Sequence, residues 1–187
     1  MSQTAIIILA VVVVAAAVAI AALMKTRKSQ QLKTRFGPEY QRAVESTGNK
    51  RLAEANLEKL ERRVHGFNLV ALTPEARAEF NAEWKQIQAR FVDDPKVALA
   101  EADQLIQKMM NARGYPTADF EQRAADISVD HPLVVENYRA GHEIALRHAQ
   151  GQATTEDMRQ AMIHYRTLFA DLAGEPEVAR AAAVGRA

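Results

Sequence analysis

The chain has 187 residues and nearly balanced charge, with 24 Lys and Arg against 23 Asp and Glu, for a net charge of +1. It contains no cysteine, which excludes disulfides, cysteine nucleophiles and thiolate metal sites. Residues 1–35 hold five basic and no acidic side chains; since the whole chain is +1 and this segment is +5, residues 36–187 carry −4. A mildly acidic domain argues against nucleic-acid binding, which requires a basic face.

Residues 5–24 are apolar throughout and directly precede a basic cluster. Twenty residues at about 1.5 Å each match the roughly 30 Å hydrocarbon core of a bilayer, so the run predicts a single transmembrane helix. Two alternatives stay open. A cleaved secretory signal has a basic start, which residues 1–4 lack, although small-residue cleavage sites exist here. A buried helix of a globular protein is rarely apolar on every face for so long.

The charge pattern also predicts an orientation. Basic residues resist translocation, so residues 1–4 should lie outside a bacterial plasma membrane, with the domain after Met24 in the cytoplasm. The basic juxtamembrane segment 25–37 either only sets this topology or also contacts anionic lipid head groups. The candidate head-group contacts are Lys25, Arg27, Lys28, Lys33 and Arg35. Alanines four residues apart in the span would let two such helices pack closely, so a homodimer is an open alternative.

Helical periodicity continues beyond the basic segment. Phe36-Gly37-Pro38 should end or kink the first helix, because proline disfavours helical conformation in the residue before it. Residues 38–72 are expected to form an amphipathic helical linker, with one helix over about 38–47 and a second, strongly charged one ending at Gly66. No stretch shows the alternation expected of a strand.

Residues 73–173 read as a helical bundle. The periodic segments predict four principal helices over about 74–93, 95–113, 132–150 and 155–173, with one short helix between the second and the third. Start signals support them: Thr73 and Asp94 each precede a proline, Asp130-His131-Pro132 resembles them, and Thr154 with Asp157 resembles a capping box. Short connections favour antiparallel neighbours. Residues 174–187 have no apolar stripe and should form a flexible tail.

The sequence offers no recognisable catalytic constellation. It has no phosphate-binding glycine loop and no nucleophile elbow. His142 and His148 lie six residues apart, which turns them about 240° from one another on a helix, whereas a shared metal ion needs a spacing of four. We therefore expect no catalytic residue, metal or cofactor. A hydrolase or metal enzyme whose residues are scattered along the chain is the remaining alternative.

Two sets of side chains are candidates for binding. The short helix and its flanking turns concentrate polar residues, which form either a face for a protein partner or caps and internal ion pairs; this set is Asp119, Arg123, Asp126, Asp130 and His131. The second set would line a pocket between bundle helices in a small-molecule or lipid sensor; it is Trp84, Tyr138, His142 and Tyr165.

Several runs resemble a group of bacterial single-pass membrane-anchored proteins that have a cytosolic helical domain and no assigned activity. The runs are Arg90-Phe-Val-Asp-Asp-Pro95, Arg113-Gly-Tyr-Pro116, Asp119-Phe-Glu-Gln-Arg-Ala-Ala-Asp126, Asp130-His-Pro132, Thr155-Glu-Asp-Met-Arg-Gln-Ala161 and His164-Tyr-Arg166. The resemblance covers most of residues 36–173, implies a bacterial inner-membrane protein and supplies no catalytic residue. The sequence thus predicts a non-enzymatic, membrane-tethered adaptor or scaffold, with the sensor as its alternative.

Overall fold

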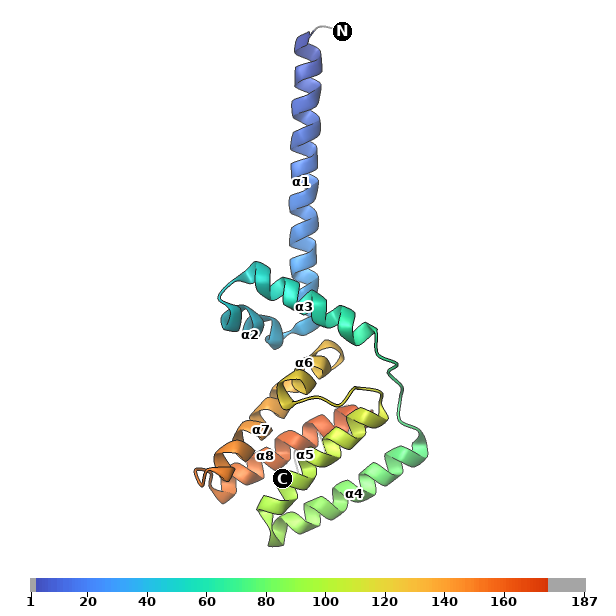
Figure 1. Cartoon of the computed structure of the whole chain (residues 1–187), viewed down its shortest axis with the longest axis vertical. Helices are drawn as coiled ribbons and strands as arrows, with labels where there is room; N and C mark the ends of the chain where they lie inside the picture. Colours follow the sequence, from blue (N-terminus) through green and yellow to red (C-terminus); the bar gives the residue numbers. More distant parts are fainter. Residues whose placement is uncertain (1–2, 175–187) are drawn as a thin grey trace. The chain divides into compact units, whose positions relative to one another are not determined.

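The computed structural model describes the backbone of residues 3–174 and the side chains of residues 12, 13, 15–20 and 22–174. Every regular element in this part of the chain is a helix, which confirms the all-α prediction (Figure 1). Residues 1 and 2 of the predicted segment 1–4, and the predicted tail after Gly174, lie outside the described residues. The chain divides into two compact units, Met1–Glu58 and Lys59–Ala187.

The first unit contains α1 (Gln3–Phe36), α2 (Pro38–Thr47) and the first half of α3 (Lys50–His65). As predicted, α1 ends at Phe36 and a proline occupies the first position of α2. The helix α2 packs against α1, and an ion pair of 2.8 Å joins Lys28 on α1 to Glu58 on α3. Residues 38–58 therefore fold beside the C-terminal part of α1, where the sequence predicted a linker.

The structure corrects the predicted transmembrane helix at residues 5–24. No helix among the described residues is both long and apolar enough to cross a membrane. Among the described side chains, an 18-residue stretch of α1 that begins at Val12 includes Lys25, Arg27 and Lys28, whereas a spanning helix needs about that length with few or no charges. The side chains of residues 5–11, 14 and 21 of the predicted span lie outside the described residues.

The second unit contains the predicted four principal helices and the short helix between them. The helices are α4 (Pro74–Asp93), α5 (Pro95–Ala112), α6 (Phe120–Asp130), α7 (Val135–Ala149) and α8 (Thr155–Leu172). Helices α4 and α5 form one hairpin and α7 and α8 a second, and α5 packs on α8 to join them (Figure 1). The resulting order in space is α4, α5, α8, α7, with α6 packed on α7.

The start of three helices follows from local chemistry that the sequence already contained. The Thr73 side chain accepts from the amide of Ala76 at the start of α4, and the Asp94 side chain accepts from that of Val97 at the start of α5. The capping box at α8 is also confirmed, because Thr154 and Asp157 each accept from the other's backbone amide. Such caps satisfy donors that the first helical turn leaves unpaired, at roughly 1 kcal/mol each.

The predicted opening of the third principal helix at Asp130-His131-Pro132 is wrong. Asp130 is instead the last residue of α6, and the backbone amide of His131 closes its final turn on the carbonyl of Ile127 at 2.8 Å. Helix α7 begins three residues after Pro132, at Val135, with no side-chain cap. The reason is that proline drives the residue before it out of helical conformation, so Pro132 ends the preceding helix.

Replacement of Gly114 by alanine should destabilise the protein by about 3 kcal/mol. Gly114 has φ +93°, and a Cβ atom there would lie 2.3 Å from the backbone oxygen of Asn68, which cannot move aside as a side chain can. Gly151 is a matched control, because its φ is +73° but nothing lies within 4 Å of an added Cβ. Gly151→Ala should therefore cost only about 1 kcal/mol. Urea denaturation of both variants measures the difference, and equal losses would contradict the role of the Asn68 contact.

Candidate functional site

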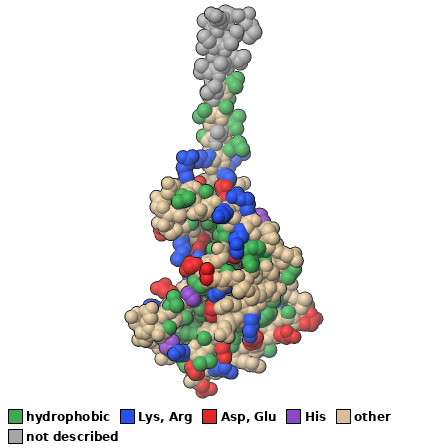
Figure 2. Space-filling model, viewed as in Figure 1, with side chains coloured by type: hydrophobic (Ala, Val, Ile, Leu, Met, Phe, Trp, Pro, Cys, Tyr) green, Lys and Arg blue, Asp and Glu red, His purple; other side chains and the backbone are tan. Residues whose placement is uncertain are grey.

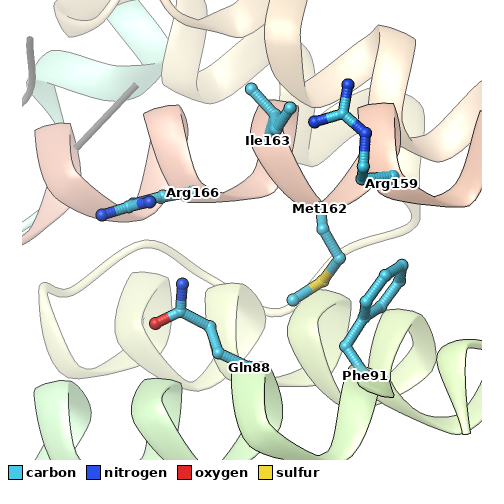
Figure 3. A pocket seen from close by; sticks show the side chains of 6 residues that line it. All are labelled: Gln88, Phe91, Arg159, Met162, Ile163 and Arg166. Atoms are coloured by element: carbon cyan, nitrogen blue, oxygen red, sulfur yellow. The ribbon is translucent and has the colours of Figure 1, made fainter. Parts of the chain in front are cut away.

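A hollow of the second unit lies between α4 and α8. One cavity of about 310 Å³ is lined by residues of both helices; they are Asn81, Trp84, Lys85, Gln88, Arg166, Phe169 and Ala170. A second, of about 170 Å³, follows it along the same helices and is lined by Gln88, Phe91, Arg159, Met162, Ile163 and Arg166 (Figure 3). Because Gln88 and Arg166 line both cavities, we treat the two cavities as one groove, the α4/α8 groove.

Aromatic and aliphatic side chains form the floor of the α4/α8 groove. The Trp84 indole stacks on the Phe169 ring, with centroids 4.9 Å apart and planes 17° apart, and thereby joins α4 to α8. Further along, Met162 extends from α8 towards Phe91 and Gln88 on α4 (Figure 3). Trp84, Met162 and Phe169 are buried and Phe91 is half-buried, so the groove has a preformed apolar base.

The rim of the groove is cationic. Lys85, Arg159 and Arg166 line it, and no carboxylate is among the residues that line either cavity. Arg159 is paired with Glu156 on the same helix at 2.8 Å, and hydrogen bonds from Arg159 and Gln160 lower the pKa of Glu156 to about 2. Within the described part of the chain, Lys85 and Arg166 have no carboxylate within ion-pair distance. Counting only residues that the structure describes, the groove thus presents two positive charges without a carboxylate partner beside an apolar floor.

The four residues of the predicted pocket do not form one site. Trp84 lies in the α4/α8 groove. Tyr138 and Tyr165 instead pack edge to face inside the bundle with ring centroids 6.2 Å apart, and His142 stacks on Phe120, which also contacts Tyr138. Burial, followed by the charge of Asp103, raises the pKa of both tyrosines, so these hydroxyls stay protonated at neutral pH.

A polar network fills the space beside this aromatic cluster. Arg123 donates to the Tyr138 hydroxyl at 3.0 Å and to the carbonyl of Ala118 at 2.8 Å, and its guanidinium lies 3.6 Å from Asp103. Tyr138 in turn donates to Asp103 at 3.3 Å. The network ties α6 to α5 and α7, since Arg123, Asp103 and Tyr138 lie on these three helices.

The predicted partner face is divided between interior and surface. Asp119 caps α6 by accepting from the amide of Gln122, and exposed Asp130 accepts from Tyr115 at 3.4 Å. Asp126 is 1% exposed and accepts from Arg63 and Gln122. Arg123 is also buried, and His131 is paired with Asp171. These contacts give each residue an intramolecular role, which the sequence analysis had left as the alternative to partner binding.

Comparisons with protein-family models, with curated proteins and with solved structures find no match to this chain. Within the part of the chain that the structure describes, no group of three or more His, Cys, Asp or Glu side chains is placed to hold a metal ion. The candidate site therefore rests on the geometry of the groove alone.

Sequence reasoning missed most of the groove. Of the residues that line the groove, the sequence analysis proposes only Trp84 as a binding residue. The sequence did contain a signal, because on each helix polar residues lie next to an apolar one on the same helical face. Lys85 and Gln88 lie next to Trp84 on α4, and Arg166 lies next to Met162 on α8. Only the packing of α4 and α8 on α5 brings these flanks together.

Replacement of Asp126 by alanine should destabilise the protein by about 2 kcal/mol. The change leaves the amide of half-buried Gln122 and the Arg63 guanidinium without their acceptor. Asp93, an exposed aspartate at the end of α4, is the control, and its alanine variant should stay within about 0.5 kcal/mol of the parent. Chemical denaturation measures both. An unchanged free energy of unfolding in Asp126→Ala would return this residue to the list of partner-binding candidates.

The half-buried histidines should make stability fall as the pH is lowered from 7 to 5. Burial lowers the pKa of His142 and of His164. The unfolded chain therefore takes up protons through about pH 6.5 while these two side chains stay neutral in the folded state, and stability is lost as pH falls towards their folded pKa values. The variant His142→Gln/His164→Gln should lose less of its melting temperature over this range than the parent. Exposed His65→Gln is the control, and an equal pH dependence of all three proteins would contradict the assignment.

Proposed function

We propose that this protein is a non-enzymatic helical adaptor that binds an acidic amphipathic helix of a partner protein in the α4/α8 groove. The observation that supports this most is the combination of an apolar floor with the uncompensated charges of Lys85 and Arg166. Apolar anchors of a partner helix would enter between Trp84 and Met162, and its carboxylates would reach the two cations. This is the helix-in-groove mode of peptide recognition.

The dimensions of the groove agree with such an occupant. On α4 the lining runs from Asn81 to Phe91, which corresponds to about 15 Å along a helix axis, or nearly three turns. A partner helix of that length presents apolar side chains at positions i, i+3, i+4 and i+7 on one face. Side chains at that spacing could enter the two cavities of the groove, which lie on either side of Gln88 and Arg166.

A small-molecule sensor is the second candidate, because the cavity beside Trp84 combines an aromatic wall with Arg166. Its volume of about 310 Å³ lies at the lower end of the range for small-molecule pockets, roughly 300–1,000 Å³. An apolar carboxylate such as a fatty acid fits this chemistry. The two candidates share the groove and differ in the occupant, so one titration distinguishes them.

Binding can be followed through the fluorescence of Trp84, the single tryptophan of the chain. A synthetic helix with leucines on one face and glutamates on the other should shift its emission, and a copy with lysines in place of the glutamates should not. In Lys85→Glu/Arg166→Glu the preference should reverse, with the acidic peptide bound about tenfold more weakly, since two exposed charge pairs contribute about 0.5–1 kcal/mol each. A gain of binding to the basic peptide cannot come from misfolding.

The matched control is Lys59→Glu/Lys96→Glu, which changes the net charge equally at exposed positions outside the groove lining. It should keep the preference of the parent. An emission shift with oleate and none with either peptide would support the sensor and reject the adaptor. Equal binding of both peptides by the parent and the charge-reversed variant would reject the groove as a charge-selective site.

A further inference from the structure

The first unit contains a cavity of its own, of about 290 Å³, between α1 and α3. Five of its lining residues come from α1 and two from α3; they are Lys25, Thr26, Ser29, Gln30, Lys33, Lys50 and Glu54. Lys25, Ser29 and Lys33 are four residues apart and therefore share one face of α1, as Lys50 and Glu54 share one face of α3. Figure 2 shows Lys and Arg side chains, in blue, gathered around the lower described part of α1.

Charge is concentrated in this cavity. Three ammonium groups and one carboxylate line it, which leaves a net charge of +2. Burial opposes ionisation of Glu54, but hydrogen bonds from Ser29 and Tyr40 and the charges of Lys50 and Lys25 together lower its pKa, so it is ionised at neutral pH. The Tyr40 hydroxyl donates to Glu54 at 2.8 Å, whereas Lys50 lies 3.7 Å from this carboxylate. The lysines therefore outnumber the negative charge that the protein itself supplies.

The positive charge of Lys50 is unfavourable at the start of α3. Lys50 begins α3, and the first turn of α3 contains no acidic residue, although the positive end of the helix dipole favours acids there by about 0.3–1 kcal/mol. The amides of Arg51 and Leu52 are capped by the Asn49 side chain, so the lysine is not needed to start the helix. A residue that lowers the stability of its helix and adds charge to a cavity is typical of a binding site.

The cavity also has fixed geometry. Lys33 lies over the Tyr40 ring at 5.6 Å from its centroid, a cation–π contact that holds its stem. Ser29 is buried, with its hydroxyl 3.5 Å from that of Tyr40. Tyr40 thus positions Lys33 through the face of its ring and the Glu54 carboxylate through a hydrogen bond from its hydroxyl. The ammonium groups of Lys25 and Lys50 and the Gln30 amide are further donors at the cavity wall.

We propose that the cavity between α1 and α3 binds a phosphate monoester, with Lys25, Lys33 and Lys50 neutralising its charge and Gln30 donating to an oxygen. A phosphate monoester carries about −1.5 to −2 at neutral pH and offers three acceptor oxygens, which matches the net charge of the cavity and its cationic donors. The group belongs either to a soluble phosphorylated molecule or to the head group of phosphatidic acid. The site is separate from the α4/α8 groove and does not depend on the adaptor function.

The test uses the full chain and two probes. Isothermal titration with glycerol 3-phosphate reports binding of a soluble monoester. Co-sedimentation with phosphatidylcholine vesicles containing phosphatidic acid reports the head group, and vesicles with phosphatidylglycerol, a phosphodiester, give the background. Lys33→Gln/Lys50→Gln should weaken monoester binding at least tenfold. Glu54→Gln should tighten it several-fold, because it removes the negative charge while keeping an acceptor for Tyr40, and a gain of affinity cannot come from unfolding.

The control Arg42→Gln/Lys59→Gln removes the same charge from exposed positions outside the cavity lining and should stay within twofold of the parent. Binding of glycerol 3-phosphate assigns the site to soluble ligands, whereas binding only to phosphatidic acid vesicles above the phosphatidylglycerol background assigns it to the head group. Absence of binding in both arms, or equal losses in the site and control variants, would overturn the proposal.

Discussion

The second unit depends on the requirement that α5 bury apolar side chains against two helices at once. Seven of its residues are buried, and it packs on α4 within its own hairpin and on α8 of the other. Each large side chain buried in this way contributes roughly 1.5–3 kcal/mol. Because α5 occupies the space between them, α4 and α8 meet through the stacked rings of Trp84 and Phe169, and the α4/α8 groove remains beside these rings. The groove is thus a consequence of how the core is built.

Buried polar groups serve a second structural purpose, the attachment of α6. This helix has only 11 residues, a length at which an isolated helix is marginal in water. Arg123 links it to α5 and α7 through Asp103 and Tyr138, and Asp126 links it to Arg63 on α3. Such groups must find partners inside the protein because an unpaired buried polar atom is costly. The residues most suggestive of chemistry in the sequence therefore stabilise the fold.

Both proposed sites place cations beside a cavity in a chain of nearly neutral net charge. In the first unit the charges come from lysines on α1 and α3, and in the second from Lys85 and Arg166. Some other cations of the described residues are paired locally, as Lys28 is with Glu58 and Lys108 is with Glu83. At each site several cations gather around one cavity, which predicts an anionic ligand there.

The sequence alone determined the helices and most of their ends, because hydrogen bonds from residue i to i−4 and caps such as Thr73, Asp94 and Thr154 depend on neighbours within a few positions. It also indicated the four-helix arrangement, although it placed a transmembrane span at residues 5–24 and misread Pro132 as a start signal. Only the tertiary structure decided that Trp84 lies apart from Tyr138 and Tyr165, that Arg123 and Asp126 are buried, and that Lys50 joins Lys25 and Lys33 around one cavity. Those relations join residues up to tens of positions apart, and side-chain packing between helices, which no local pattern encodes, sets them.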